Sequence, residues 1–282
     1  MGTASELPLD ILGCIADVLG NFHKLRSQNR QAVKDLQMLC LTCKSMVPIC
    51  RRHLFAHIEF IHTGSHWWYN GLNEFLLSHP TIATHYLKSL HIRVTDEFSA
   101  LDYELLQKIR LNSSALTSIK ILSDLCCWDD LSNRVKSVVY SLIQMPTLRH
   151  LTLNCIENFP AAALQSLCIG LKELTFHDSC SLAPPVSGDD AMQNPTITTL
   201  AFEQTYSSYN ITFSSLTKPI GQNTVFAFDR VKNIYANIPD QAEGFDACKV
   251  LERAICLEHL ELSGEFHALT VKCAYPDILL NS

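Results

Sequence analysis

The sequence predicts an α/β protein in which a small N-terminal helical module precedes a curved parallel sheet with helices on its outside. Two observations predict this fold. One apolar spacing recurs seven times from Leu87 onward, with helix-like segments between several copies, and the first sixty residues carry apolar residues at helical spacing. We expect the helical module to span residues 5–57 and the repeating region to span residues 58–282.

The composition excludes several classes of protein. The 282-residue chain has a formal net charge of −6, with 47% hydrophobic and 18% charged residues, whereas a disordered chain needs low hydrophobicity and high charge. Mild acidity without a basic block argues against nucleic acid as a partner. The sequence shows neither a bilayer-spanning stretch nor a signal-peptide pattern, so we expect no membrane association, a cytoplasmic or nuclear location, and 12 cysteines that are thiols.

The first helix is predicted from Leu7 to Phe22, because its apolar residues follow one another at steps of three and four. Pro8 fits the first helical turn, where a missing N–H costs nothing. The polar stretch at residues 20–31 is expected to connect this helix to the next one as a loop.

A second apolar stripe runs from Val33 to Val47, and Pro48 either ends that helix or opens the next short one. A strand is expected at residues 57–61, and the aromatic residues 67–69 after it are expected to cover the core where the module meets the repeats. A helical unit this small buries little apolar surface by itself. The module is therefore a candidate for interaction with a partner.

Two segments of the module, ELPLDILGCIADVL and DLQMLCLTCKSMVPICRRHLF, resemble an F-box. The first matches the family's opening Leu-Pro, the carboxylate that follows and the apolar helical positions, at Leu7, Pro8, Asp10, Ile11 and Ile15. The second matches its Asp-Leu, Leu, Cys and basic positions, at Asp35, Leu36, Leu39, Cys43 and Lys44, with Met46 in place of the usual aromatic residue. Residues 40–55 are particularly similar to the expanded F-box group of basidiomycete, mushroom-forming fungi.

The resemblance implies a binding subunit and not an enzyme. F-boxes dock on the Skp-type adaptor of Skp–cullin–F-box ubiquitin ligases, and through it on a cullin, while the rest of the chain recruits a protein substrate. The positions that would dock on the adaptor are Leu7, Pro8, Ile11, Ile15, Leu36 and Leu39. Two alternatives stay open: these positions pack only the module's own core, or the chain is an F-box-like repeat scaffold for protein–protein interaction outside any ligase.

The region after the module repeats the spacing Leu-x-x-Leu-x-Leu, with other apolar residues allowed. The copies begin at Leu87, Leu116, Leu148, Leu171, Ile197, Val231 and Leu257. They start 29, 32, 23, 26, 34 and 26 residues apart, close to the period of roughly 20–29 residues in leucine-rich repeats. In each copy the last two apolar residues alternate with another residue, usually polar, as in a strand with one face inward. Helices are expected between copies at residues 99–110, 129–145 and 241–255.

Strand, helix and strand at this period predict a degenerate leucine-rich-repeat solenoid. Its concave strand face would select the target, through polar residues between the repeat apolar positions: His91, Lys120, Thr152, Thr175 and Glu261. Residues 181–195 are typical of a loop, and residues 206–219 of a strand. The C-terminal tail offers no obvious polar cap, so we expect a last strand at residues 268–273, or an array that is incomplete or covered by a partner.

The spacing of the cysteines offers metal binding and catalysis as alternatives to simple packing. Cys40 and Cys43 form a single Cys-x-x-Cys, to which Cys50 and His53 would add two ligands. A structural zinc site usually has two such pairs, and thiols on an apolar helix face serve as small hydrophobic groups. We therefore expect no metal and no cofactor. An enzyme built on a cysteine and a distant histidine stays open as an alternative, although no phosphate loop, nucleophile elbow or carboxylate pair is present.

Overall fold

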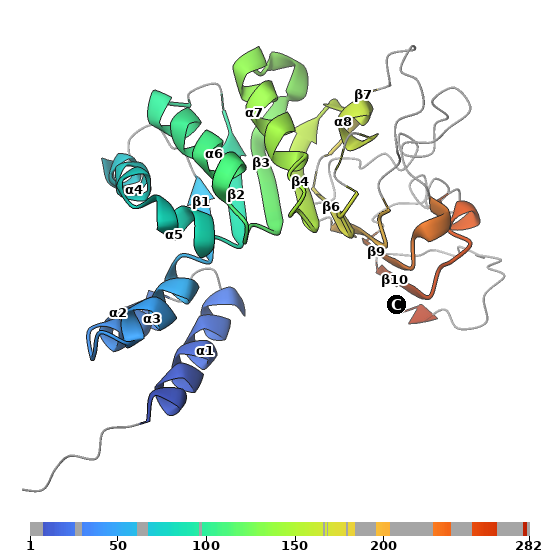
Figure 1. Ribbon diagram of the computed structural model, residues 1–282. Coiled ribbons are helices and arrows are strands. Elements are labelled where there is room, and N and C mark those ends of the chain that lie inside the picture. Colours follow the sequence, from blue (N-terminus) through green and yellow to red (C-terminus); the bar gives the residue numbers. More distant parts are fainter. Residues whose placement is uncertain are drawn as a thin grey trace, which may run out of the picture.

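The computed structural model describes residues 8–25, 30–60, 67–95, 98–165, 167, 169–178, 180–183, 196–203, 228–237, 250–263 and 279–280. Within them, three N-terminal helices project from one end of a parallel sheet, and further helices cover one side of that sheet (Figure 1). The predicted α/β class is confirmed. None of the described helices has the length and apolar character needed to cross a bilayer.

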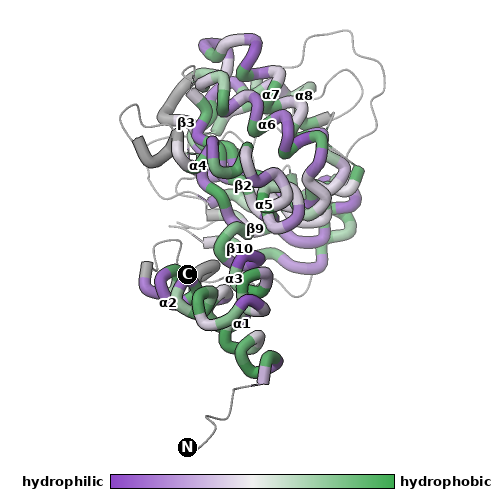
Figure 2. The backbone as a smooth tube through the Cα atoms, turned by 60° about the vertical axis from the view of Figure 1, so that its left-hand side comes forward, coloured by the Kyte–Doolittle hydropathy of each residue, from purple (hydrophilic) through white to green (hydrophobic). Residues whose placement is uncertain are grey.

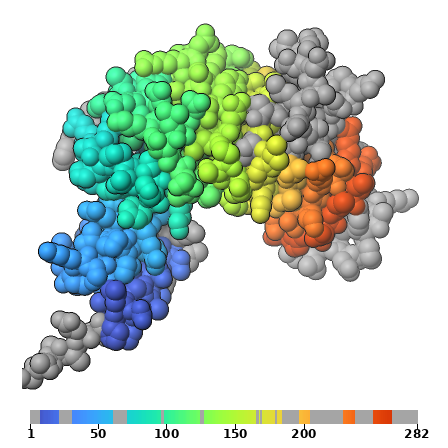
Figure 3. All heavy atoms as spheres, in the orientation of Figure 1, coloured from blue at the N-terminus to red at the C-terminus, as the bar shows by residue number. Residues whose placement is uncertain are grey.

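The projecting part consists of α1 (Leu9–Leu25), α2 (Arg30–Cys40) and α3 (Met46–Leu54). The three helices meet around a small core that is separate from the core behind the sheet. Its fully enclosed side chains are Ala16, Leu36, Met46 and Cys50. The space-filling view in Figure 3 shows this helical module standing out from the body of the protein.

The helix boundaries differ from the predicted ones at two places. Helix α1 continues through residues 20–25, where a loop was expected. A Cβ atom at Gly20 would lie 2.1 Å from Nδ1 of His53, so glycine allows α1 and α3 to cross closely there. Helix α2 ends at Cys40 and does not reach Val47, because the chain turns at Leu41 and Thr42, where the Thr42 hydroxyl donates to the Leu39 carbonyl at 2.7 Å.

The main sheet follows the order of the chain. Its strands are β1 (His57–Phe60), β2 (Ser89–Val94), β3 (Ser118–Cys127), β4 (His150–Glu157), β6 (Glu173–His177), β8 (Thr199–Glu203), β9 (Asn233–Asn237), β10 (His259–Ser263) and β11 (Leu279–Leu280). All neighbouring pairs are parallel. Two shorter strands, β5 (Phe159–Pro160) and β7 (Leu182–Ala183), pair separately. Each of the seven repeat copies forms one strand, as predicted.

The register places equivalent residues of every copy side by side. The second apolar residues form one buried row across the sheet: Leu90, Ile119, Leu151, Leu174, Leu200, Ile234 and Leu260. The third apolar residues form a parallel buried row: Ile92, Ile121, Leu153, Phe176, Phe202, Ala236 and Leu262. These rows belong to one continuous core, so the residues between them point to the opposite face.

The helices on one side of the sheet are α4 (Trp67–Ser78), α5 (Pro80–His85), α6 (Ala100–Asn112), α7 (Asn133–Ile143) and α8 (Ala161–Gln165). Helices α6 and α7 were predicted, whereas α4 and α5 were not. Ser99 and Asp102 form a capping box that starts α6. The buried Asp102 carboxylate also accepts a hydrogen bond from Asn73 and so joins α6 to α4.

Several predicted features lie outside the described residues. They are the strands expected at residues 206–219 and 268–273, most of the helix expected at 241–255, and most of the loop expected at 181–195. Residues 250–253 at the end of that helix are helical.

Candidate protein-docking surfaces

The first candidate surface is the outward face of α1. Its members are Ile11, Cys14, Ile15 and Val18, which follow the spacing i, i+3, i+4, i+7 and are called the outer stripe here. Ile11, Ile15 and Val18 are 47%, 41% and 54% exposed. Figure 2 shows α1 as a largely hydrophobic helix at the edge of the molecule.

The outer stripe is not the face that holds the module together. Leu12, Ala16 and Leu19 lie on the other side of α1 and pack with the small core. Helix α1 therefore carries two apolar stripes, of which its own module covers one. A helix that is apolar on both sides is usually buried on both sides.

A polar cluster fixes the direction in which α1 presents the outer stripe. The Asp17 carboxylate accepts a hydrogen bond from Arg52 and lies 2.9 Å from Nε2 of His53, so it ties α1 to α3. Desolvation alone would raise the pKa of Asp17, but the hydrogen bonds from Arg52 and His53 outweigh it and hold that pKa below its usual value. Desolvation lowers the pKa of His53, despite the opposing effect of Asp17.

The predicted adaptor-binding residues fall into three groups. Pro8, Ile11 and Ile15 are exposed on or beside α1, and Leu7 lies outside the described residues. Leu39 is half-buried against the small core. Leu36 is fully buried, because α2 turns this side chain inward between α1 and α3, so it is not on the exposed surface of the module and its contact with a partner stays a prediction.

Sequence reasoning missed part of the exposed apolar surface of the module. The single apolar series predicted from Leu7 to Phe22 does not separate the exposed Val18 from Leu19, and the exposed Met38 and Leu41 were not singled out. The signal was present, since residues 11, 15 and 18 and residues 12, 16 and 19 each follow helical spacing. Two such series in one short helix indicate two apolar faces.

The second candidate surface lies on the sheet face opposite the core. The register aligns one residue from each successive strand: Glu59, His91, Lys120, Thr152, Thr175, Ala201, Tyr235 and Glu261, which are called the polar row here. All five predicted target-binding residues belong to this row. The structure thus brings together side chains that lie up to 170 positions apart in the sequence (261 − 91).

The polar row carries both charge signs and a neutralised histidine. His91 lies between Glu59 and Lys120 in the register. Desolvation is the main reason that the pKa of His91 is below its usual value; Lys120 lowers it further, and Glu59 opposes both. In the adjacent row, Nδ1 of His150 lies 2.9 Å from the Glu173 carboxylate.

One residue of the polar row departs from its predicted exposure. Thr175 is 6% exposed, whereas Lys120 is half-buried and Glu261 is exposed. A short side chain in the middle of a sheet is flanked by strands on both sides and ends within the sheet surface, while a lysine side chain reaches further. Thr175 therefore contributes little to a contact surface.

Eight of the 12 cysteines lie among the described residues, and all eight are free thiols. Cys50 is buried in the small core and its pKa is raised to about 11, mainly by desolvation, while Cys43 is exposed beside Ser45. The described residues contain no group of three or more His, Cys, Asp or Glu side chains that could hold a metal ion. Desolvation raises the pKa of the buried Cys180 to about 12, so this thiol is protonated and a poor nucleophile at neutral pH.

No family model matches the chain, and comparison with curated proteins finds no match. The described residues form an α/β protein with a parallel sheet and a separate group of N-terminal helices, and they carry the two candidate surfaces described above.

Proposed function

We propose that this chain is a substrate-receptor subunit of a Skp–cullin–F-box ubiquitin ligase. In this role the helical module is an F-box that docks on a Skp-type adaptor, and the sheet is a degenerate leucine-rich-repeat solenoid that binds a protein target. The chain itself forms and breaks no bonds. It raises the effective concentration of the target near a ubiquitin-loaded enzyme, in the cytoplasm or the nucleus.

The observation that supports this proposal most strongly is the outer stripe of α1. The small core uses the neighbouring stripe of α1, and the outer stripe stays exposed although three of its four side chains are aliphatic. Exposed aliphatic clusters on small modules usually mark interaction sites. The F-box-like motifs at residues 7–15 and 35–44 cover this same helix and its neighbour, so motif and surface point to the same partner.

The free energy gained by covering the outer stripe is sufficient for a specific contact. Covering one aliphatic side chain completely is worth about 1.5–3 kcal/mol. Ile11, Ile15 and Val18 are each about half exposed, so a partner recovers only part of that value from each. Placing a carboxylate at the centre of the interface adds the cost of an unpaired buried charge, which is several kcal/mol.

The target would bind on the polar row. It combines carboxylates, a lysine, a histidine and the aromatic ring of Tyr235, which is 37% exposed and lies 5.4 Å from the ring of His259. Aromatic and charged groups on a rigid sheet are typical of protein-binding faces. The adaptor contact and the target contact thus use different parts of the chain.

Coexpression with a Skp-type adaptor tests the proposal. We expect the wild-type chain and the adaptor to copurify as a stoichiometric complex, and we expect the double variant Ile11→Asp, Ile15→Asp to lose the adaptor. The matched control is Leu111→Asp, because Leu111 is 63% exposed on α6, away from the helical module. This control should keep the adaptor. Circular dichroism and the thermal midpoint check that all variants fold.

If the folded wild-type chain ignores the adaptor, the protein is a repeat scaffold outside the ligase and the proposal fails. If the control loses the adaptor as completely as the double variant does, the contact is not on α1.

A further inference from the structure

An open pocket of about 610 Å³ lies at the edge of the sheet where five neighbouring strands begin. Its walls come from the segments just before β6, β8, β9 and β10 and from the residue before β4. Four cationic side chains line it, namely Arg149, Lys172, Arg230 and Lys232, against one carboxylate, that of Asp229. This surplus is unusual in a chain of net charge −6. It is called the strand-start pocket here.

The repeat itself brings these cations together. Arg149, Lys172 and Lys232 occupy the same position in their copies, one residue after the first apolar residue. The carbonyl of Arg149 accepts hydrogen bonds from the N–H groups of Lys172 and Glu173, and the carbonyl of Lys172 accepts from Thr198 and Thr199 in the same way. Neighbouring strands lie about 4.8 Å apart, so this backbone ladder holds the basic side chains along one edge.

Arg149 is positioned for a ligand before one arrives. Its Nη1 donates to the carbonyls of Pro146 and Leu148, at 2.9 and 2.8 Å. A Cβ atom at Gly170 would lie 2.1 Å from this Nη1, so the absence of a side chain there leaves room for the guanidinium. Nε and Nη2 of Arg149 make no hydrogen bond to the described residues.

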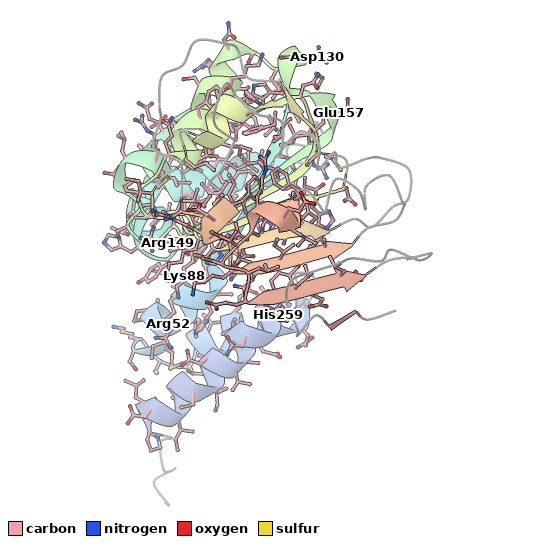
Figure 4. The ribbon with its side chains drawn as sticks, turned by 90° about the vertical axis from the view of Figure 1, so that its right-hand side faces the viewer. Arg52, Lys88, Asp130, Arg149, Glu157 and His259 are labelled. Atoms are coloured by element: carbon pink, nitrogen blue, oxygen red, sulfur yellow. The ribbon has the colours of Figure 1, made fainter. Side chains whose placement is uncertain are left out.

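The other cations differ in how far they are already neutralised. Lys232 forms an ion pair with Glu258 at 2.5 Å. The charged side chains of Lys172 and Arg230 have no hydrogen-bond or ion-pair partner within the described part of the chain. Figure 4 shows Lys88 and Arg149, which precede β2 and β4, on the side of the molecule where the strands begin, the side that also carries Arg52 of the helical module.

We propose that the strand-start pocket binds a phosphate group. A phosphate ester carries a charge of about −1.5 to −2 and three strong acceptor oxygens, which suits several converging cations better than a carboxylate does. Arginine presents paired donors to such an anion. The volume lies within the range of small-molecule sites, about 300–1,000 Å³, so both a soluble phosphate compound and a phosphorylated side chain fit. The site is distinct from the outer stripe and does not depend on adaptor docking.

The test is calorimetric titration of the full-length chain with two probes, pyrophosphate and a phosphoserine peptide, with the unphosphorylated peptide as reference. We expect saturable binding of at least one phosphate probe and none of the reference. Binding of pyrophosphate alone assigns the site to a soluble phosphate compound, and binding of the peptide assigns it to a modified protein. The double variant Lys172→Glu, Arg230→Glu should lower the affinity for whichever phosphate probe binds by at least about tenfold.

Two further variants separate a built site from general basic charge. Gly170→Ala keeps every charge but displaces the Arg149 guanidinium, so it should lower the affinity for the probe about threefold or more. Lys88→Glu reverses the charge at the equivalent position before β2, outside the pocket, and should leave the affinity unchanged. Thermal midpoints check that the variants fold. Absence of saturable binding to the wild-type chain, or equal weakening by Lys88→Glu, overturns the proposal.

Discussion

The helical module and the sheet body differ in how completely they bury their apolar side chains. In the body, each repeat adds apolar residues to rows that already exist, so every strand except those at the ends is covered by neighbours. In the described part of the module, the small core fully encloses Ala16, Leu36, Met46 and Cys50, and a second apolar stripe on α1 stays exposed. The difference teaches that the body covers its own apolar rows, whereas the module leaves one apolar stripe exposed, and this stripe is where we propose that a partner docks.

The largest effect should come from the core of the body. Phe176 is 2% exposed and its ring lies 5.6 Å from the ring of Phe202 in the next strand. Phe176→Ala removes this contact and leaves a cavity, so the free energy of unfolding should fall by about 3–5 kcal/mol. Denaturant titration measures the change. Leu111→Ala, at a residue 63% exposed, is the control and should change stability by less than about 0.5 kcal/mol.

A smaller and more local effect is expected from the core of the module. Leu36→Ala should cost about 2–5 kcal/mol of the module's stability. Because its core is separate from the main one, amide hydrogen exchange should increase in α1, α2 and α3 while β2, β3 and β4 keep their protection. An equal increase in both regions would show that the two cores unfold as one unit.

The polar row should make the body sensitive to pH. Desolvation holds the pKa of His91 below the ordinary histidine value of 6.5, so the unfolded chain binds a proton more readily than the folded one. Stability should therefore fall as the pH drops below about 6.5, until the folded pKa is passed. His91→Gln should reduce this loss, as measured by thermal midpoints at a series of pH values. An unchanged pH dependence in the variant would mean that His91 is not the group that titrates.

The smallest effect should come from the cluster that orients α1. Asp17→Asn removes the charge that Arg52 and His53 share, at a site where the Asp17 side chain is 50% exposed. Solvent screening limits such pairs to no more than about 1 kcal/mol. Because the pKa of Asp17 is lowered in the folded chain, its contribution should be present above pH 3.8 and be lost as the pH falls through the folded pKa. The free energies of unfolding of the variant and of the wild-type chain, measured over a series of pH values, should therefore become equal at low pH.

The sequence predicted the body better than the module. Apolar residues that alternate along a strand all lie on the same face of the sheet. Their positions therefore predicted the strands and also the register between neighbouring strands, which includes the alignment of the polar row. Helices α4 and α5 were not predicted, because residues 63–85 begin with a polar and aromatic run and show no clear helical spacing of apolar residues. The end of α1 was missed because the polar composition of residues 20–25 is typical of a loop, whereas α1 continues through them and crosses α3 closely at Gly20.

The sites were predictable to different degrees. Ile11 and Ile15 were found from their motif, but the inward direction of Leu36 depends on how three helices pack, which spacing alone does not determine. The strand-start pocket was not predicted, because its residues lie up to 107 positions apart in the sequence (256 − 149). Its signal was nevertheless present: Lys or Arg follows the first apolar residue in four of the seven copies, namely those that begin at Leu87, Leu148, Leu171 and Val231.

The most direct test of the central claim is the affinity of the full-length chain for a purified Skp-type adaptor, measured by calorimetry. Complete burial of two aliphatic side chains is worth about 3–6 kcal/mol, and about 1.4 kcal/mol corresponds to a factor of ten. Because Ile11 and Ile15 are only half exposed before binding, and because the introduced charges add their own cost, we expect Ile11→Asp, Ile15→Asp to weaken binding by about a hundredfold or more. Equal affinity of the wild-type chain and this variant would contradict the claim that the outer stripe of α1 is where the partner docks.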